Sequence, residues 1–184
     1  MKNSNRLTSP RGDVKTLLTF RKAQIIYDLT YHFAHTFLSR GDRTVDQMIQ
    51  AARSGKQNIA EGNAAGVTSM ETAIKLTNVA KASFLELLLD YEDYLRVRSL
   101  RQWEKDSVEV AFIRQKVKDP AVSDQWYVDL ARTRPAETVA NMAICFLHQE
   151  DVLLQAQLDT LEKQFRAQGG FRERLLKARL ENQD

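Results

Sequence analysis

Three residues have the types and the spacing of a metal site. Asp28, His32 and His35 stand at positions i, i+4 and i+7 of one predicted helix, so their side chains share a face. Carboxylate and imidazole groups bind transition metals. Di-iron carboxylate bundles, however, place Glu-x-x-His pairs on two helices, and no glutamate stands three residues before a histidine in this chain. We therefore favour solvated or interface polar side chains over a metal site, and we expect no cofactor.

Two other groups of residues could take part in acid–base or nucleophilic chemistry. Glu86, Asp90 and Asp93 form a carboxylate stripe on a predicted helix, an arrangement more typical of solvent-facing charge. Cys145 and His148 are three residues apart, but no neighbouring residue would orient the base or bind an oxyanion. The sequence also has no Gly-rich phosphate loop, zinc-ligand spacing or serine nucleophile motif. We therefore expect a protein that is not an enzyme.

Basic residues are the more promising binding groups. In an antiparallel arrangement the end of the first helix, the start of the second and the end of the third lie at the same pole, where their arginines would face one phosphate-rich ligand. Ordinary solvated side chains are the alternative interpretation. The candidate nucleic-acid-binding residues are Arg21, Lys22, Arg40, Arg43, Arg53, Lys56, Arg96, Arg98 and Arg101.

The charge of the chain is distributed unevenly. The net charge of +3 is too small to indicate nucleic-acid binding by itself. Residues 1–40, however, hold seven Lys or Arg and two Asp, whereas residues 135–168 hold two basic and five acidic residues. This separation suits either a polyanionic partner or head-to-tail self-association.

The segment 42–62, DRTVDQMIQAARSGKQNIAEG, is predicted to be a helix with one thin face. Thr44 and Gln47 have the spacing of a capping box at its start, and Gly62 suits its end. A glycine inside a helix costs about 1 kcal/mol relative to alanine. Gly55 therefore predicts close contact with the backbone of another element.

Asn58, Glu61 and Gly62 form a candidate structural motif at the end of this segment. Glu61 faces the negative end of the helix dipole and so needs a partner. Thr68 and Glu71 have the spacing of a second capping box. We expect Glu61, with Asn58 one turn earlier, to accept hydrogen bonds from the start of the next helix; solvated side chains are the alternative.

Apolar periodicity predicts the remaining elements. The predicted helices span residues 14–38, 69–98, 100–118 and, after Pro135, the segment up to Gly169, with a loop or short helix at 122–130. The apolar belt of the third helix is too wide for one contact, which favours burial against another subunit. These elements predict an all-α fold, an antiparallel up-down four-helix bundle with an extra crossover helix and a short C-terminal amphipathic tail.

The predicted bundle domain covers residues 14–168, between a disordered N-terminus (1–13) and a basic amphipathic tail (169–184). The 184 residues include no apolar run of membrane-spanning length and no signal-peptide pattern. We therefore expect a cytoplasmic protein with no membrane partner.

Two strings in the second helix carry a family resemblance. They are QAARS at Gln50–Ser54 and NIAEG at Asn58–Gly62. Together with Ala23, Ile26, Tyr27 and Phe33 and the segment Asn78–Leu88, they make residues 17–98 similar to the bacterial four-helix bundle family linked to the intervening sequence of 23S rRNA, also called S23 ribosomal protein. The string GGFRERLLKARLE resembles a suffix segment of part of that family.

The resemblance implies a closed up-down bundle, frequently a ring-like homopentamer, without enzymatic activity. A relative, the accessory variability determinant protein of diversity-generating retroelements, is implied to bind nucleic acid and a reverse transcriptase. We therefore expect a homo-oligomer that binds RNA or DNA without strong sequence preference. The alternatives are a protein-interaction scaffold that binds a partner through residues 171–184 and, third, a metal-dependent bundle enzyme.

Overall fold

The computed structural model describes residues 13–169, 173 and 180, and these residues form helices and connecting turns without β-strands. Apart from Asp13, Gly169, Glu173 and Leu180, the predicted disordered N-terminus and the predicted basic tail lie outside the described residues. No described helix combines the length and the apolar character needed to span a bilayer. The elements are η1 (Val14–Thr16), α1 (Leu18–Phe37), α2 (Arg43–Ala65), α3 (Met70–Val97), α4 (Val108–Lys118), α5 (Asp124–Ala131) and α6 (Ala136–Gln168).

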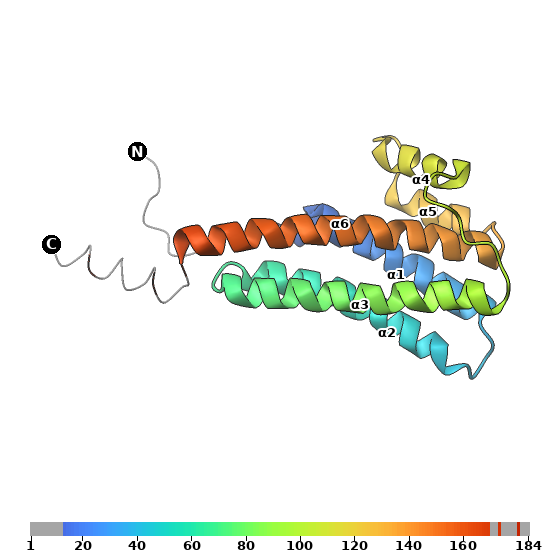
Figure 1. Cartoon of the computed structure of the whole chain (residues 1–184), viewed down its shortest axis with the longest axis horizontal. Helices are drawn as coiled ribbons and strands as arrows, with labels where there is room; N and C mark the ends of the chain where they lie inside the picture. Colours follow the sequence, from blue (N-terminus) through green and yellow to red (C-terminus); the bar gives the residue numbers. More distant parts are fainter. Residues whose placement is uncertain (1–12, 170–172, 174–179, 181–184) are drawn as a thin grey trace.

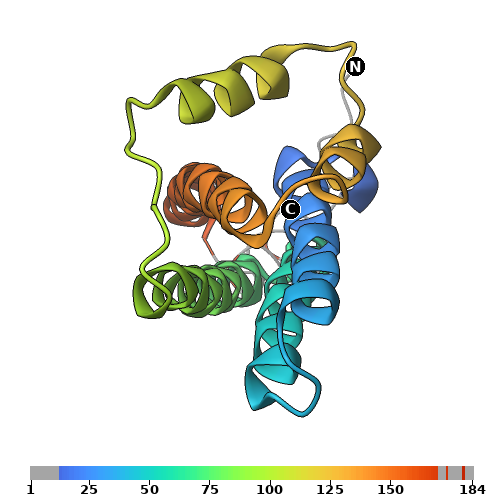
Figure 2. The same cartoon turned by 90° about the vertical axis from the view of Figure 1, so that its right-hand side faces the viewer.

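The long helices α1, α2, α3 and α6 pack around one core. Helix α1 contacts α2 and α6, and α3 contacts the same two helices. Figure 1 shows α3 and α6 running side by side along the longest axis of the molecule. The shorter helices lie outside this group: α5 packs on α1, and α4 stands beside the outer side of α6 (Figure 2). The all-α prediction is confirmed.

The first predicted helix is interrupted near its start. Asp13 caps η1 by accepting a hydrogen bond from the Lys15 amide. Leu17 then adopts an extended backbone (φ −68°, ψ 130°), and α1 begins at Leu18. The prediction of one continuous helix over residues 14–38 is therefore wrong, because the Asp13 cap closes a separate single turn.

The predicted caps of α2 are also wrong. Asp42 caps the helix by accepting a hydrogen bond from the Thr44 amide (2.9 Å), which displaces the predicted Thr44–Gln47 box. Gly62 does not end the helix, which continues to Ala65 with Gly66 as its C-cap. A Cβ on Gly62 would lie 3.4 Å from Leu76 Cβ, so this glycine lies at the contact with α3.

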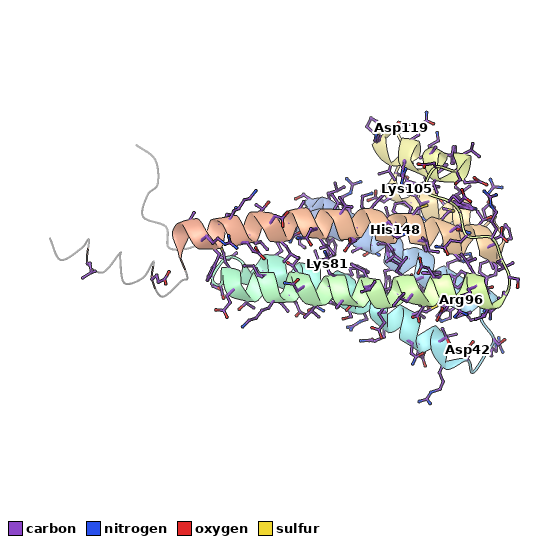
Figure 3. The ribbon with its side chains drawn as sticks, in the orientation of Figure 1. Asp42, Lys81, Arg96, Lys105, Asp119 and His148 are labelled. Atoms are coloured by element: carbon purple, nitrogen blue, oxygen red, sulfur yellow. The ribbon has the colours of Figure 1, made fainter. Side chains whose placement is uncertain are left out.

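Asp42 and Arg96 lie at the same end of the molecule (Figure 3).

Gly55 lies where α2 and α3 approach each other closely. A Cβ on Gly55 would lie 2.5 Å from the Phe84 ring, and Ser54 and Ser83 hydroxyls are 2.9 Å apart at the same level. The predicted close contact is confirmed, but its partner is a buried aromatic ring and not a backbone.

The predicted third and last helices agree with α3 and α6. Ser69 caps α3 by accepting from the Thr72 amide, so the predicted Thr68–Glu71 box is wrong. Helix α6 ends at Gln168, and its C-cap is Gly169, whose φ of 68° is left-handed and favours glycine.

The predicted helix 100–118 begins later than expected. Residues 99–107 form a linker, and α4 starts after the Ser107 cap. The buried Asn141 side chain of α6 accepts a hydrogen bond from the Trp103 amide (2.7 Å) and donates one to the Arg101 carbonyl (2.8 Å). Backbone groups of the linker are therefore hydrogen-bonded by a side chain of α6, so they do not need a helical turn as partner.

The loop or short helix predicted at 122–130 corresponds to α5 (Asp124–Ala131), whose aromatic side chains cover the edge of the core. Ser123 caps this helix by accepting from the Trp126 amide. Tyr127 is buried, and its ring meets Phe146 edge-on at a centroid distance of 4.9 Å. Trp126 is partly buried against the same cluster.

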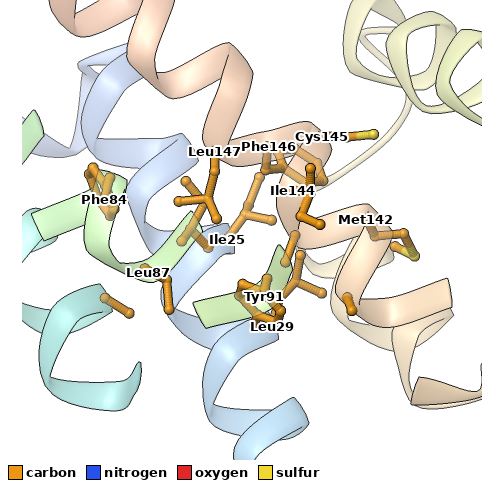
Figure 4. Close-up of a cluster of buried hydrophobic side chains, with 14 of the residues drawn as sticks. Ile25, Leu29, Phe84, Leu87, Tyr91, Met142, Ile144, Cys145, Phe146 and Leu147 are labelled. Carbon is orange, nitrogen blue, oxygen red and sulfur yellow. The ribbon is translucent and has the colours of Figure 1, made fainter. Parts of the chain in front are cut away.

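The core contains side chains from α1, α3 and α6 (Figure 4). Phe33 meets the rings of Tyr91 and Tyr94 edge-on. The hydroxyl of the fully buried Tyr91 donates a hydrogen bond to Thr30 Oγ1 (3.0 Å), which in turn donates to the Ile26 carbonyl. The polar groups of this region are thus satisfied inside the core.

Candidate functional site

The arginine pole, Arg40, Arg43, Arg96, Arg98 and Arg101, lies around the α1–α2 turn and the end of α3. Hydrogen bonds from Thr44 lower the pKa of Asp42, and the charge of Arg98 lowers it further. The turn before α2 and the last residues of α3 are therefore electrostatic neighbours.

Much of this pole is already engaged by other side chains. Arg96 pairs with Asp93 (2.7 Å), and Arg101 pairs with Glu109 (2.9 Å). The Arg98 guanidinium lies 3.9 Å from the centroid of the Tyr94 ring. Among the described residues, Arg40 and Arg43 make no hydrogen bond or ion pair through their side chains. The pole is therefore less available to phosphates than a set of solvated arginines would be.

Arg21 and Lys22 connect α1 to neighbouring helices. Arg21 donates two hydrogen bonds to the Asp124 carboxylate of α5 (2.8 and 2.9 Å), which raise its pKa. The Lys22 side chain is only 6% exposed and donates to Gln149 Oε1 of α6 (2.7 Å). Burial lowers the pKa of Lys22. Arg21 is exposed but already paired with Asp124, and Lys22 is buried, so neither side chain is as available to a phosphate as a solvated one.

The two basic residues of α2 have different environments. Arg53 is exposed and makes no ion pair with any residue that the structure describes. Lys56 is partly buried, with its Nζ 4.1 Å from the centroid of the Tyr27 ring and 3.2 Å from Gln24 Oε1. Lys56 therefore joins α2 to α1, and Arg53 remains available to a ligand.

The predicted latch between α2 and α3 is wrong. Glu61 is exposed and has no hydrogen-bond partner in the described part of the chain. Asn58 donates to the Ser54 carbonyl within its own helix (2.9 Å). Because Ser69 already caps α3, the start of that helix does not need Glu61.

The three candidate metal ligands of α1 have separate partners. Asp28 accepts a hydrogen bond from Gln24, and His35 Nδ1 lies 2.9 Å from the Tyr31 carbonyl. Burial lowers the pKa of His32. Within residues 13–169, 173 and 180, no three His, Cys, Asp or Glu side chains are arranged to hold a metal ion.

The other two candidate groups, the carboxylate stripe of α3 and the Cys145–His148 pair of α6, have different environments. Burial, with the charges of Glu86 and Asp93, raises the pKa of Asp90, and Asp93 is paired with Arg96. Burial raises the pKa of Cys145 to about 11, so its thiol is protonated at neutral pH. A protonated thiol is a weak nucleophile.

An apolar stripe runs along the outside of α3. This outer stripe comprises Val79, Ala82, Leu85 and Leu89, which recur at steps of three or four residues. Val79, Leu85 and Leu89 are 47%, 57% and 52% exposed, whereas Phe84 and Leu87 face the core. The wide apolar belt predicted for this helix therefore has one face in the core and one face exposed.

Glu150 on α6 was not predicted as a notable residue. It is fully buried, and neither carboxylate oxygen has a hydrogen-bond partner in the described structure. Burial raises its pKa to about 9, although the charge of Lys22 acts in the opposite direction. Its position four residues after Phe146 and four before Leu154 is the signal that could have placed it on the core face.

Searches against protein-family models, curated proteins and solved structures give no match to the chain.

Proposed function

We propose that this chain is a non-enzymatic helical assembly protein that forms homo-oligomers through the outer stripe of α3. The observation that carries the proposal is the exposure of Val79, Leu85 and Leu89 on one face of a helix whose opposite face already lies in the core. Contiguous exposed apolar side chains are typical of protein–protein contacts. A second copy of the chain packed against the outer stripe would bury these side chains.

The proposed architecture is an antiparallel up-down four-helix bundle, as the resemblance to the 23S rRNA intervening-sequence family implies. Short turns between α1 and α2 and between α2 and α3 support it, and α4 and α5 belong to the crossover from α3 to α6. A ring of five copies and a cytoplasmic location are part of the same proposal.

The test is the mass of the full chain in solution, measured by analytical ultracentrifugation at several concentrations. We expect an oligomer for the natural sequence and a monomer for Leu85→Glu combined with Leu89→Glu, because a contact would bury two carboxylates. Val108→Glu is the matched control, since Val108 is 80% exposed but lies on α4. Circular dichroism checks that each variant keeps its helices.

Two results would contradict this proposal. One is a monomeric natural chain at every concentration. The other is an oligomer whose mass is changed neither by Leu85→Glu combined with Leu89→Glu nor by Val108→Glu.

A second candidate function is nucleic-acid binding without strong sequence preference. It is supported by Arg40, Arg43 and Arg53, which are exposed and have no ion pair among the described residues. Each phosphate contact is weak, but an oligomer would present the same arginines several times. A scaffold that binds only proteins, including partners of residues 171–184, is the alternative if nucleic acid does not bind.

A further inference from the structure

A cavity of about 820 Å³ lies between α6, the 99–107 linker and α4. Its size falls within the range of about 300–1,000 Å³ that is typical of small-molecule sites. Apolar side chains from all three elements line it, including Trp103, Val110, Ile144 and Val152. Figure 4 shows Cys145, another lining residue, pointing away from the labelled core side chains and toward this side of α6.

The charged side chains of the cavity are mainly cationic. Lys22, Lys105 and Arg114 line it, together with one carboxylate, Asp151, which lies 3.2 Å from Lys81 Nζ. In the described part of the chain, the side chains of Lys105 and Arg114 make no hydrogen bond or ion pair. Two cations are therefore free to bind an anion.

Lys22 adds a buried positive charge to the same cavity. It reaches the cavity from α1, is 6% exposed and is held by Gln149, which is also a lining residue. The nearby Glu150 is fully buried, and because its pKa is raised to about 9, its carboxyl group is neutral at pH 7. Glu150 therefore does not cancel the charge of Lys22.

We propose that this cavity binds a small carboxylate with an apolar body, such as a medium-chain fatty acid. The carboxylate would pair with Arg114 and Lys105, since guanidinium groups bind carboxylates through two parallel hydrogen bonds. The hydrocarbon would pack against Trp103, Val110 and Val152. The basic C-terminal segment is a poor occupant, because Arg172, Arg174 and Lys177 carry the same charge as the cavity.

Titration of decanoate into the full chain tests the proposal. Isothermal calorimetry gives the stoichiometry, and the fluorescence of Trp103, recorded in a Trp126→Phe background, reports binding next to the cavity. We expect saturable binding of decanoate and much weaker binding of two probes: acetate, which lacks the apolar body, and decyltrimethylammonium, which has the opposite charge.

Two sets of variants locate the site. Arg114→Gln combined with Lys105→Gln is expected to weaken decanoate binding at least about tenfold, because each charge-assisted hydrogen bond contributes enough for such a change. Lys118→Gln, an exposed residue of α4 outside the lining, is the matched control. Leu85→Glu combined with Leu89→Glu should bind decanoate as the natural chain does, so that this site is distinguished from the proposed oligomer contact.

The proposal is overturned if decanoate shows no saturable binding or if decyltrimethylammonium binds equally well. It is also overturned if the double glutamine variant, with its helices intact by circular dichroism, keeps the affinity of the natural chain.

Discussion

The Phe84 ring of α3 lies directly against Gly55 of α2, with its Cε1 and Cζ atoms 2.5 Å from the position that a Cβ on Gly55 would occupy. Phe84 is buried, so the ring cannot move aside without displacing core side chains. The thin face of α2 is therefore the space into which an aromatic side chain of α3 packs.

Gly55→Ala is expected to destabilise the protein, although alanine is the better helix former. The helix gains about 1 kcal/mol from the substitution. Overpacking against Phe84 costs about 1–3 kcal/mol, so the free energy of unfolding should fall by about 1 kcal/mol. Urea unfolding followed by circular dichroism, at one fixed protein concentration, measures the change.

Gly62→Ala is the matched control for this prediction. A Cβ on Gly62 would lie 3.4 Å from Leu76 Cβ, which is an ordinary van der Waals contact. The substitution should therefore leave stability unchanged or raise it by up to about 1 kcal/mol. If Gly55→Ala and Gly62→Ala have the same free energy of unfolding, the Phe84 ring moves to make room for the added methyl group and the prediction is wrong.

Glu150 is expected to make the protein less stable as the pH rises from about 5.5 to 8.5. Burial raises its pKa from 4.5 to about 9, so between these values the folded chain holds a proton that the unfolded chain has released. The free energy of unfolding then falls with pH, by at most about 1.4 kcal/mol per pH unit. Urea midpoints at several pH values measure the slope.

Glu150→Gln separates this effect from other titrating groups. Glutamine has a similar shape and no charge, so the variant should lose most of the downward slope between about pH 5.5 and 8.5. His32, whose lowered pKa produces a slope of opposite sign, is unchanged in both proteins. Equal slopes for the natural chain and the variant would mean that Glu150 ionises in the folded state near its ordinary pKa.

Nucleic-acid binding, if the second candidate function is correct, should depend on the arginines without ion pairs. We expect Arg40→Gln, Arg43→Gln and Arg53→Gln together to weaken binding of a labelled single-stranded RNA by about tenfold or more at low salt, and to reduce the salt slope. Fluorescence anisotropy at about 50 and 200 mM salt measures both quantities.

The control for this prediction is Arg96→Gln combined with Arg101→Gln. Both residues already pair with carboxylates, Asp93 and Glu109, so their removal should matter less than removal of the exposed arginines. Absence of binding even at low salt rejects the nucleic-acid function and leaves the protein-only scaffold.

Local sequence patterns were sufficient for the bounds of α3 and α6, but not for the start of α1 or the end of α2. The bounds of α3 and α6 follow from apolar residues at steps of three and four, from Gly169 after the end of α6, and from the absence of proline within both helices. Where two cap-forming residues lie close together, as Asp42 and Thr44 do, the pattern does not select between them. The choice between them depends on which residue has the non-helical backbone conformation of an N-cap.

What the sequence by itself determined is the helical content and the apolar face of each long helix, because both depend on residues within one segment. Only the tertiary structure decided which charged side chains lack a partner. Arg21 pairs with Asp124, which lies 103 residues later in the chain. Lys22 and Glu150 are buried because α6 packs on α1. Burial and ion pairing depend on neighbours that are distant in the chain. For that reason the basic residues looked alike in the sequence and have different environments in the fold.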